Sequence, residues 1–300
     1  MADVSVLTFN GAPRNVKDVT ARNTANAATT AQEYDRQQLT GTYKGRSIAS
    51  VFAAEIGSAN VWTWLQKRVK AANFMGLRIG DYIDVQLKAG ANVPSQTVRY
   101  RIAAIDPYYQ CGDTAKGHHI AMVPSAPVSV TGDKAVNGSY IKWRDTNDNN
   151  GTADEKHPYL CSKLHEWEIG DFLPSLPTEC QAAIMPQRVL LNERYASSGK
   201  LTDDSGWSWV DLGKVWSLSE IEVYGFQAWS KTGYSIGFDC HFPIFEDTAS
   251  RIFGTRVIWW LRSVMGGSSS LVCYVFSNGG ADSTAATFDW VRPFPCFLVG

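Results

Sequence analysis

The chain lacks the features that direct a protein to a membrane or to nucleic acid. It has no uninterrupted apolar run near the ~20 residues that cross a bilayer. Its Met-Ala-Asp-Val start has no basic region followed by an apolar one, so we expect no signal peptide. Its 28 Lys and Arg residues are balanced by 29 Asp and Glu residues, with a net charge of −1. We therefore expect a soluble chain that neither binds nucleic acid nor inserts into a membrane.

The motifs of common enzymes are also missing. No G-x-S-x-G, P-loop, G-x-G-x-x-G or H-E-x-x-H motif occurs. The segment His165–Ile169 begins like the last of these, but Ile169 stands where the second His is required. Cys273 and Cys296 are a candidate redox pair, although two core thiols are the favoured interpretation. We predict that the protein is not an enzyme and uses no cofactor.

Two segments have the composition of a metal site without its spacing. His118-His119 lies near Cys111, but its neighbours do not supply four ligands at zinc spacing. The run Asp145–Gly151 resembles a calcium loop, yet Asn150 stands where Gly is needed and Lys156 where the bidentate Glu belongs. We predict no metal at either place, but a structural pair on an edge strand and a solvated loop.

The cysteines are few and scattered. No C-x-x-C pair occurs, so free, buried thiols are favoured over a disulfide framework, whose pairing order could not be deduced from spacing. The six are Cys111, Cys161, Cys180, Cys240, Cys273 and Cys296.

Hydrophobic periodicity predicts a few helices and short strands. Apolar residues at three- and four-residue spacing indicate a helix over 58–73, begun by Ser58. Alternation indicates three strands that form a small antiparallel sheet. The strands are expected at 79–87, 98–105 and 119–124, further helices at 159–173 and 177–183, polar or irregular segments at 125–158, 192–213 and 230–245, and strands at Trp259 and at the end of the chain.

The first fifty residues differ from the rest. They are rich in Ala, Asn and Thr and contain no Trp, so they cannot bury much apolar surface alone. We expect residues 1–50 to be an arm that docks on a partner, with a disordered tail as the alternative. Residues 51–300 are expected to form one domain.

The end of the chain has two aromatic-rich blocks around a segment of different composition. The blocks are Trp259–Ser263 and Val291–Phe294, whose bulky residues and fixed cations suit a packed frame. The enclosed residues 264–290 contain no Lys, Arg, Glu, Gln or Pro and are rich in Ser, Gly, Thr, Ala and aromatics. That is the composition of a binding surface, so we predict a frame that displays a contact surface.

These two blocks carry a resemblance to a known group, together with five further segments: Trp216–Glu220, Val223–Gly225, Gly279, Gly80–Ile83 and His118–Val123. They resemble a domain common in phages and in surface proteins of gut bacteria, over roughly residues 75–300. The closing part is similar to the C-type-lectin-like fold of phage tropism determinants, the targets of diversity-generating retroelements. The resemblance implies an α+β, loop-rich, C-type-lectin-like fold with small antiparallel sheets, a few helices and an extended N-terminal arm.

The resemblance also implies roles for residues. Arg262 and Arg292 would be internal clamps that donate to carbonyls or carboxylates, with ligand contact as the rival role. The sequence departs from the family pattern at Val264, where Pro is usual, and at Phe294–Cys296, which replaces a smaller ending. The implied frame is Trp259, Trp260, Leu261, Arg262, Ser263, Gly279, Val291, Arg292 and Pro293. The implied ligand-binding positions are Ser268, Ser269, Ser270, Phe276, Asn278, Asp282, Ser283, Thr284, Thr287, Phe288, Asp289 and Trp290.

The function implied is receptor binding on a phage virion. The partners would be a host cell-surface glycan or protein and, through the arm, other virion proteins; a homotrimer is expected by analogy. Residues Asn15–Arg22 likewise resemble the start of phage fibre proteins. The alternative is a decoration, collar or fibre protein that uses the same fold for assembly. The remote kinship of this fold with formylglycine-generating oxidases keeps an enzyme as a minor alternative.

Overall fold

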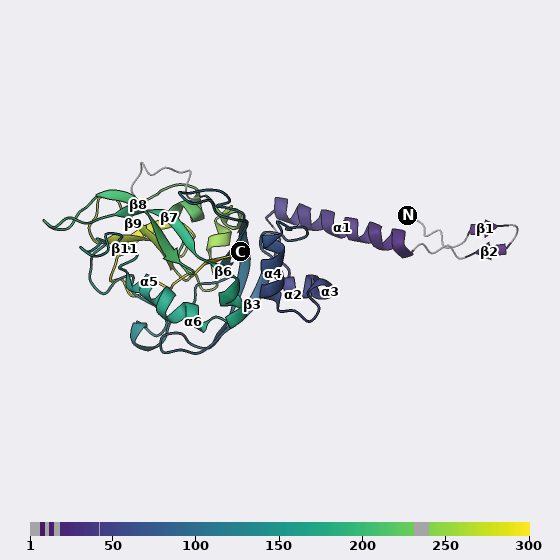
Figure 1. Ribbon diagram of the computed structural model, residues 1–300, viewed down its shortest axis with the longest axis horizontal. Helices are drawn as coiled ribbons and strands as arrows, with labels where there is room; N and C mark the ends of the chain where they lie inside the picture. Colours follow the sequence, from purple (N-terminus) through teal and green to yellow (C-terminus); the bar gives the residue numbers. More distant parts are fainter. Residues whose placement is uncertain (1–6, 10–11, 15–18, 42, 231–239) are drawn as a thin grey trace. The chain divides into compact units, whose positions relative to one another are not determined.

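The computed structural model describes residues 7–9, 12–14, 19–41, 43–230 and 240–300. The chain divides into two compact units, Met1–Lys44 and Gly45–Gly300. Figure 1 shows their elements, and each unit is described here by itself.

The first unit contains a short hairpin and one long helix. Strand β1 (Leu7–Phe9) pairs antiparallel with β2 (Ala12–Arg14), and helix α1 spans Val19–Leu39. Five Ala residues favour the helix, as does the ion pair between Glu33 and Arg36 at 2.6 Å. The sequence pattern gave no sign of α1, because the helix has no apolar face. Residues 15–18 of the fibre-like motif lie outside the described residues.

The main sheet of the second unit has the strand order β3-β4-β5-β12-β6 and is antiparallel at every pairing. The prediction of three antiparallel strands at its start is confirmed, and Ile83, Val85 and Leu87 point to the buried face as the alternation required. The closing strand β12 lies between β5 and β6, which explains the apolar end of the chain. The bounds are β3 Tyr82–Leu87, β4 Gln96–Ile105, β5 Ile120–Pro124, β6 Ile184–Met185 and β12 Phe297–Val299.

Short helices precede and follow the first three strands. The predicted helix 58–73 is present but shorter, because Asn60 rather than Ser58 caps it: its Oδ1 accepts from the Trp62 N–H at 2.8 Å. The predicted helical segment 159–173 begins at Lys163 and includes a π-helical turn, and the helix at 177–183 is confirmed. The bounds are α2 Ile48–Val51, α3 Ala53–Ile56, α4 Val61–Lys70, α5 Lys163–Trp167, η2 Glu168–Phe172, α6 Leu173–Ser175 and α7 Thr178–Ala183.

A two-stranded sheet occupies both ends of the segment predicted as a loop over 192–213, while residues 194–205 form a loop as predicted. Strand β7 (Gln187–Glu193) pairs antiparallel with β8 (Gly206–Gly213), so Trp207 and Trp209 belong to a strand. The prediction was wrong over 206–213, because β8 is half-buried along most of its length and its burial does not alternate. Its regular structure comes from the hydrogen bonds to β7.

The third sheet holds the aromatic-rich end of the chain, with the order β11-β10-β9. Strand β9 (Trp259–Val264) is the strand predicted at Trp259, and β10 (Leu271–Val275) and β11 (Ala281–Ala285) form a hairpin within residues 264–290. Of the segment predicted as irregular over 230–245, residues 231–239 lie outside the described residues. The remaining helices are η1 Gly132–Lys134, α8 Glu220–Tyr224, η3 Pro243–Phe245 and η4 Ala249–Arg251.

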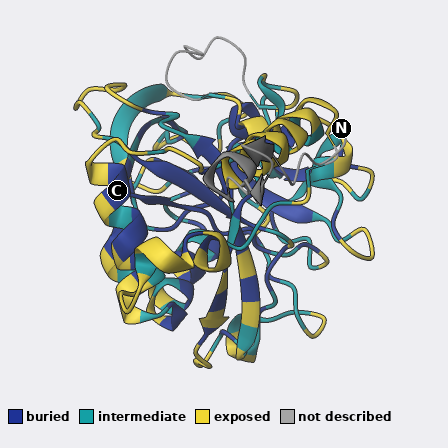
Figure 2. Cartoon of the chain, turned by 90° about the vertical axis from the view of Figure 1, so that its right-hand side faces the viewer, coloured by how far each residue is buried: buried dark blue, intermediate teal, exposed yellow. Residues whose placement is uncertain are grey.

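The second unit therefore has the mixed α+β class that was predicted, with small antiparallel sheets and few helices. Figure 2 shows its strands buried where they pass through the middle and exposed residues at the loop tips. All six cysteines are free, as predicted, but only Cys180, Cys273 and Cys296 are buried, and Cys111 is exposed. No helix among the described residues is long and apolar enough to cross a membrane.

Candidate functional site

The frame residues of β9 lie in the core of the second unit. Trp259 and Trp260 are fully buried, and their indole N–H groups donate to the carbonyls of Arg251 at 3.3 Å and Ile141 at 2.7 Å. Trp259 also stacks on Phe294, with ring centroids 4.2 Å apart. The two indoles thus tie β9 to the short helix that ends at Arg251 and to the loop at Ile141.

Arg262 is an internal clamp. Its Nη1 lies 2.5 Å from Glu222 Oε2 and its Nη2 3.1 Å from Glu222 Oε1, and Nη1 also donates to the Ser217 carbonyl at 3.1 Å. Both partners of the ion pair are buried. Glu222 in addition accepts from the Tyr108 hydroxyl and from the Ser219 backbone N–H, so α8, β9 and the loop after β4 meet at this carboxylate.

A second buried carboxylate extends this polar cluster. Glu168 accepts from the Tyr159 hydroxyl and from Ser217 Oγ, the latter at 2.6 Å. Burial, followed by the charge of Glu168, raises the pKa of Tyr159 well above its usual value. The hydroxyl therefore stays protonated as a donor. These groups satisfy each other inside the fold, which indicates a structural role.

Arg292 holds a different partner from the one expected. Its Nη2 donates to the Ser139 hydroxyl at 2.7 Å, and its guanidinium lies 5.1 Å from the centroid of the Tyr140 ring. The expected carbonyl or carboxylate partner is replaced by this hydroxyl. The flanking Val291 and Pro293 are buried.

The predicted ligand-binding positions do not form one patch. They lie at the β10–β11 turn, along β11, and in the loops at the opposite end of the hairpin. None is buried, but only Phe276, Asn278 and Trp290 are exposed and the other nine are half-buried. The segment 264–290 also contributes to the core through Val264, Val272, Cys273, Tyr274, Val275, Gly279 and Ala286. Because small and polar residues occur at both buried and solvent-facing positions of this segment, its composition did not predict which positions are buried.

The free edge of β11 is covered at several points. The Trp229 indole N–H donates to the Ala281 carbonyl at 3.0 Å, Asp282 Oδ1 accepts from the Ser283 N–H at 2.8 Å, and the Phe288 N–H donates to the Ala285 carbonyl at 2.8 Å. These contacts occupy groups that would otherwise pair with another strand.

An aromatic surface, defined here as Phe226, Trp229 and Phe276, lies beside the hairpin. Their exposed fractions are 57%, 42% and 40%. Trp229 is held on β11 by its indole hydrogen bond. The rings of Tyr224 and Phe226 are in contact, with their centroids 6.2 Å apart, and the Tyr224 hydroxyl donates to the Gly279 carbonyl in the β10–β11 turn. Phe226 and Trp229 were absent from the predicted positions because they lie some forty residues earlier. Their aromatic type was the only available signal.

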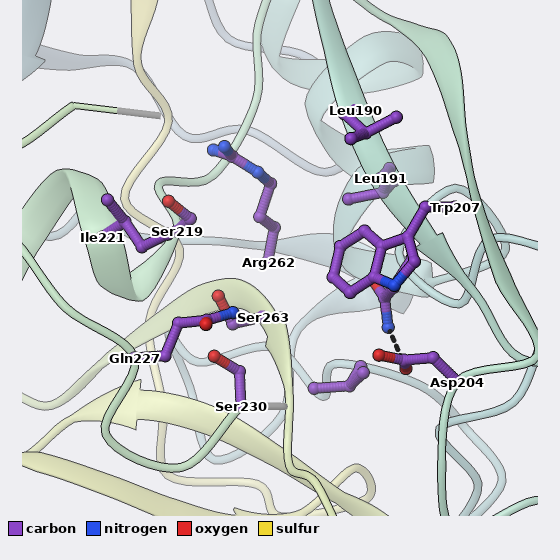
Figure 3. A pocket seen from close by; sticks show the side chains of 12 residues that line it. Leu190, Leu191, Asp204, Trp207, Ser219, Ile221, Gln227, Ser230, Arg262 and Ser263 are labelled. Atoms are coloured by element: carbon purple, nitrogen blue, oxygen red, sulfur yellow. Dashed lines mark hydrogen bonds between the residues drawn. The ribbon is translucent and has the colours of Figure 1, made fainter. Parts of the chain in front are cut away.

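A pocket lies between β7, β8, α8 and β9 (Figure 3). It contains about 430 Å³ of empty space, part of it open to solvent. Its walls combine apolar side chains, an indole and several polar groups: Leu190, Leu191, Asn192, Asp204, Trp207, Ser219, Ile221, Gln227, Ser230, Arg262, Ser263 and Val264. Of these residues, only Arg262 and Ser263 were predicted to have a role, as part of the frame; the residues from 190 to 230 are far from them in the sequence.

The two segments with metal-like composition are held by other contacts. His118 Nδ1 lies 2.6 Å from Asp106 Oδ2, and the His118 ring stacks on Tyr109. Within the described ranges, no group of three or more His, Cys, Asp or Glu side chains is arranged to hold a metal. The prediction of a solvated loop over 145–151 is wrong for Asn149 and Asn150, which are buried; the Asn149 amide donates to the Ser268 and Leu271 carbonyls.

Comparison with known proteins places this domain in a family. The family described as "Domain of unknown function (DUF6273)" matches residues 132–298, which is more than half of the chain. The chain belongs to the DUF6273 family. The matched DUF6273 region includes the pocket, the aromatic surface and the whole third sheet. No curated protein and no solved structure matches the chain.

Proposed function

We propose that this protein binds a receptor on a host cell from the surface of a phage virion, through a C-type-lectin-like domain. The observation that carries the proposal is the aromatic surface on a rigid support. Phe226, Trp229 and Phe276 are large, exposed and attached to elements whose polar groups are internally paired. Exposed aromatic side chains in fixed positions are the usual anchors of a binding interface.

The chemistry of this surface suits a cell-surface glycan or protein. Asn278, two residues after Phe276, is exposed. The Asp282 carboxylate accepts from the hydroxyl of Tyr274, whose ring contacts Phe276, so polar groups lie near this part of the aromatic surface. Aromatic faces supply contact area and the polar rim supplies direction. No metal, cofactor or catalysis forms part of the proposal.

The position of the protein on the particle is part of the same proposal. Residues 1–50 dock on other virion proteins, and a homotrimer multiplies weak contacts into avidity. The alternative is a decoration, collar or tail-fibre protein in which the aromatic surface is buried against another subunit. A reverse-transcriptase gene beside an adenine-rich copy of codons 264–290 would indicate that the surface is diversified.

Binding of the fluorescently labelled full chain to intact gut bacteria tests the proposal. We expect saturable binding to some strains, and at least a tenfold loss for the variant Phe226→Ser/Trp229→Ser/Phe276→Ser. Met75→Ser, at an exposed apolar residue outside the aromatic surface, is the control and should bind normally. Trp290→Ser tests the other end of the hairpin. Normal cell binding by the triple variant would contradict the proposal, and loss with Trp290→Ser alone would place the contact at that end.

A further inference from the structure

We propose that the outer face of residues 139–142 and 290–292 binds a carboxylate group carried on a ring. This site, called here the Trp290 face, consists of Tyr140, Lys142, Trp290 and Arg292. It shares no residue with the aromatic surface and does not depend on the proposed receptor function. The argument rests on two cations without a carboxylate partner, on two aromatic rings in contact and on the fixed backbone beneath them.

The two segments of the Trp290 face lie side by side. The Ile141 N–H donates to the Val291 carbonyl at 3.0 Å, and both of these side chains are fully buried. The residues before and after each of them are not buried, which is the alternation of an extended segment. Four side chains therefore point outward together, and they are Tyr140, Lys142, Trp290 and Arg292.

The two rings and the guanidinium of this face are in contact. The ring centroids of Tyr140 and Trp290 are 5.3 Å apart, and the Arg292 guanidinium lies 5.1 Å from the Tyr140 centroid. Trp290 is 51% exposed, so its indole offers a face on which another ring can pack. A ring bound there would have Arg292 within reach of an acid group attached to it.

One nitrogen of Arg292 is available to a ligand. Its Nη2 donates to the Ser139 hydroxyl at 2.7 Å, and its Nε is buried. Its Nη1 forms no hydrogen bond with a described residue and is not one of the buried unpaired atoms, so it reaches solvent. This accessible nitrogen, and not the buried Nε, is the donor that a carboxylate would contact through a charge-assisted hydrogen bond.

The charges of the Trp290 face suit a single anionic group. In the part of the chain that the structure describes, neither Arg292 nor Lys142 forms an ion pair, and neither does Asp289, which precedes Trp290. Two cations and one carboxylate leave one positive charge uncompensated. A singly charged carboxylate balances that charge better than a phosphate with two negative charges.

The backbone that carries these side chains is fixed without a ligand. The backbones of Val136 and Tyr140 exchange hydrogen bonds of 2.9 and 3.0 Å across a turn that contains Asn137-Gly138. Both turn residues have a positive φ, +48° and +88°, which Asn and Gly adopt most readily. The Arg292 carbonyl accepts from the N–H of Trp260 in β9 at 3.0 Å. Groups held in this way lose little freedom when a ligand binds.

The test is an NMR titration of the full chain with benzoate and with D-glucuronate at low ionic strength, followed at the Trp290 indole N–H. The matched probes are benzamide and D-glucuronamide, which keep the ring and the shape of the acid but carry no charge. We expect an acid to bind with a Kd on the order of 1–10 mM, as its few heavy atoms allow, and its amide at least about fivefold more weakly. Binding of benzoate alone indicates an aromatic acid as the source, and binding of glucuronate alone indicates an acidic sugar. Equal binding of each acid and its amide, or no binding of either acid, would overturn the proposal.

Variants at the two cations examine their roles directly. Arg292→Gln removes the guanidinium, so we expect at least about a tenfold loss of affinity for the acid and none for the amide. Lys142→Gln removes an ammonium group that holds no other residue, so it should weaken acid binding about twofold to fivefold without changing stability. Lys70→Gln removes an exposed charge from α4 and should bind like the natural chain. If Arg292→Gln does not fold, Lys142→Gln and the comparison of acid with amide decide the matter. A folded Arg292→Gln protein with unchanged affinity for the acid would contradict the proposal.

Discussion

Arg262 in β9 and Glu222 in α8 form a buried ion pair through two separate N–O contacts of 2.5 and 3.1 Å. Because neither side chain reaches solvent, loss of Arg262 leaves the Glu222 carboxylate buried without its cation. We expect Arg262→Ala to lower the free energy of unfolding by about 3–5 kcal/mol, measured by urea denaturation. Arg188→Ala breaks a half-exposed pair with Asp113 and should cost no more than about 1 kcal/mol. An unchanged unfolding midpoint with lost cell binding would instead assign Arg262 to ligand contact.

His119 should make the protein less stable in mild acid. Its Nδ1 bonds the Gly117 carbonyl at 2.7 Å and its Nε2 accepts from the Tyr108 N–H at 3.1 Å, an arrangement that needs the neutral ring. Burial lowers the pKa of His119 from 6.5 to about 4. Between these values the unfolded chain binds the proton more strongly, so stability falls as the pH drops from about 6.5 to about 4. The full contribution of this shift to stability is about 3 kcal/mol.

Denaturant unfolding at several pH values compares the natural chain with His119→Gln. The difference in stability between the two should shrink as the pH falls through this window, because only the natural chain loses the contribution of His119. A constant difference from pH 7.5 to pH 4 would show that His119 does not titrate this way.

Gly279 in the β10–β11 turn cannot accept a larger residue without strain. Its φ is +81°, and an added Cβ would lie 2.7 Å from the Thr248 carbonyl oxygen. We expect Gly279→Ala to cost at least about 2 kcal/mol of stability. Gly267→Ala has a similar φ of +79° but open space around the Cβ, so it should cost only about 1 kcal/mol. Equal losses in thermal unfolding would mean that the contact with Thr248 is unimportant.

The cysteines should differ in reactivity in the folded protein. Cys111 is exposed, whereas Cys273 and Cys296 are buried, and burial raises the pKa of both buried thiols well above the usual value. Alkylation with iodoacetamide, read by mass spectrometry, should label Cys111 first and leave these two unmodified until denaturant is added. Fast labelling of Cys273 without denaturant would reveal that the β10–β11 hairpin opens.

Local patterns were enough for the elements that bury one face. Strand β3 alternates between buried and exposed residues, and α4 has its buried residues at helical spacing. Strands β5 and β9 are buried on both faces, and continuous runs of apolar and aromatic residues indicated them instead. Strand β8 and helix α1 gave no such signal. The first is stabilised by its ladder with β7, and the second is exposed over residues 23–30.

The sequence by itself determined that the end of the chain contains a rigid aromatic frame around a segment of small and polar residues. Large aromatic residues are usually found in the protein interior, so the composition of the two blocks was enough to predict that they form a packed frame. Only the tertiary structure decided which of the residues 264–290 reach solvent, and it added Phe226 and Trp229 to them. It alone brought Asp204, Trp207 and Arg262 to one pocket. Such proximity arises from strand pairing and packing between distant segments, which no local spacing encodes.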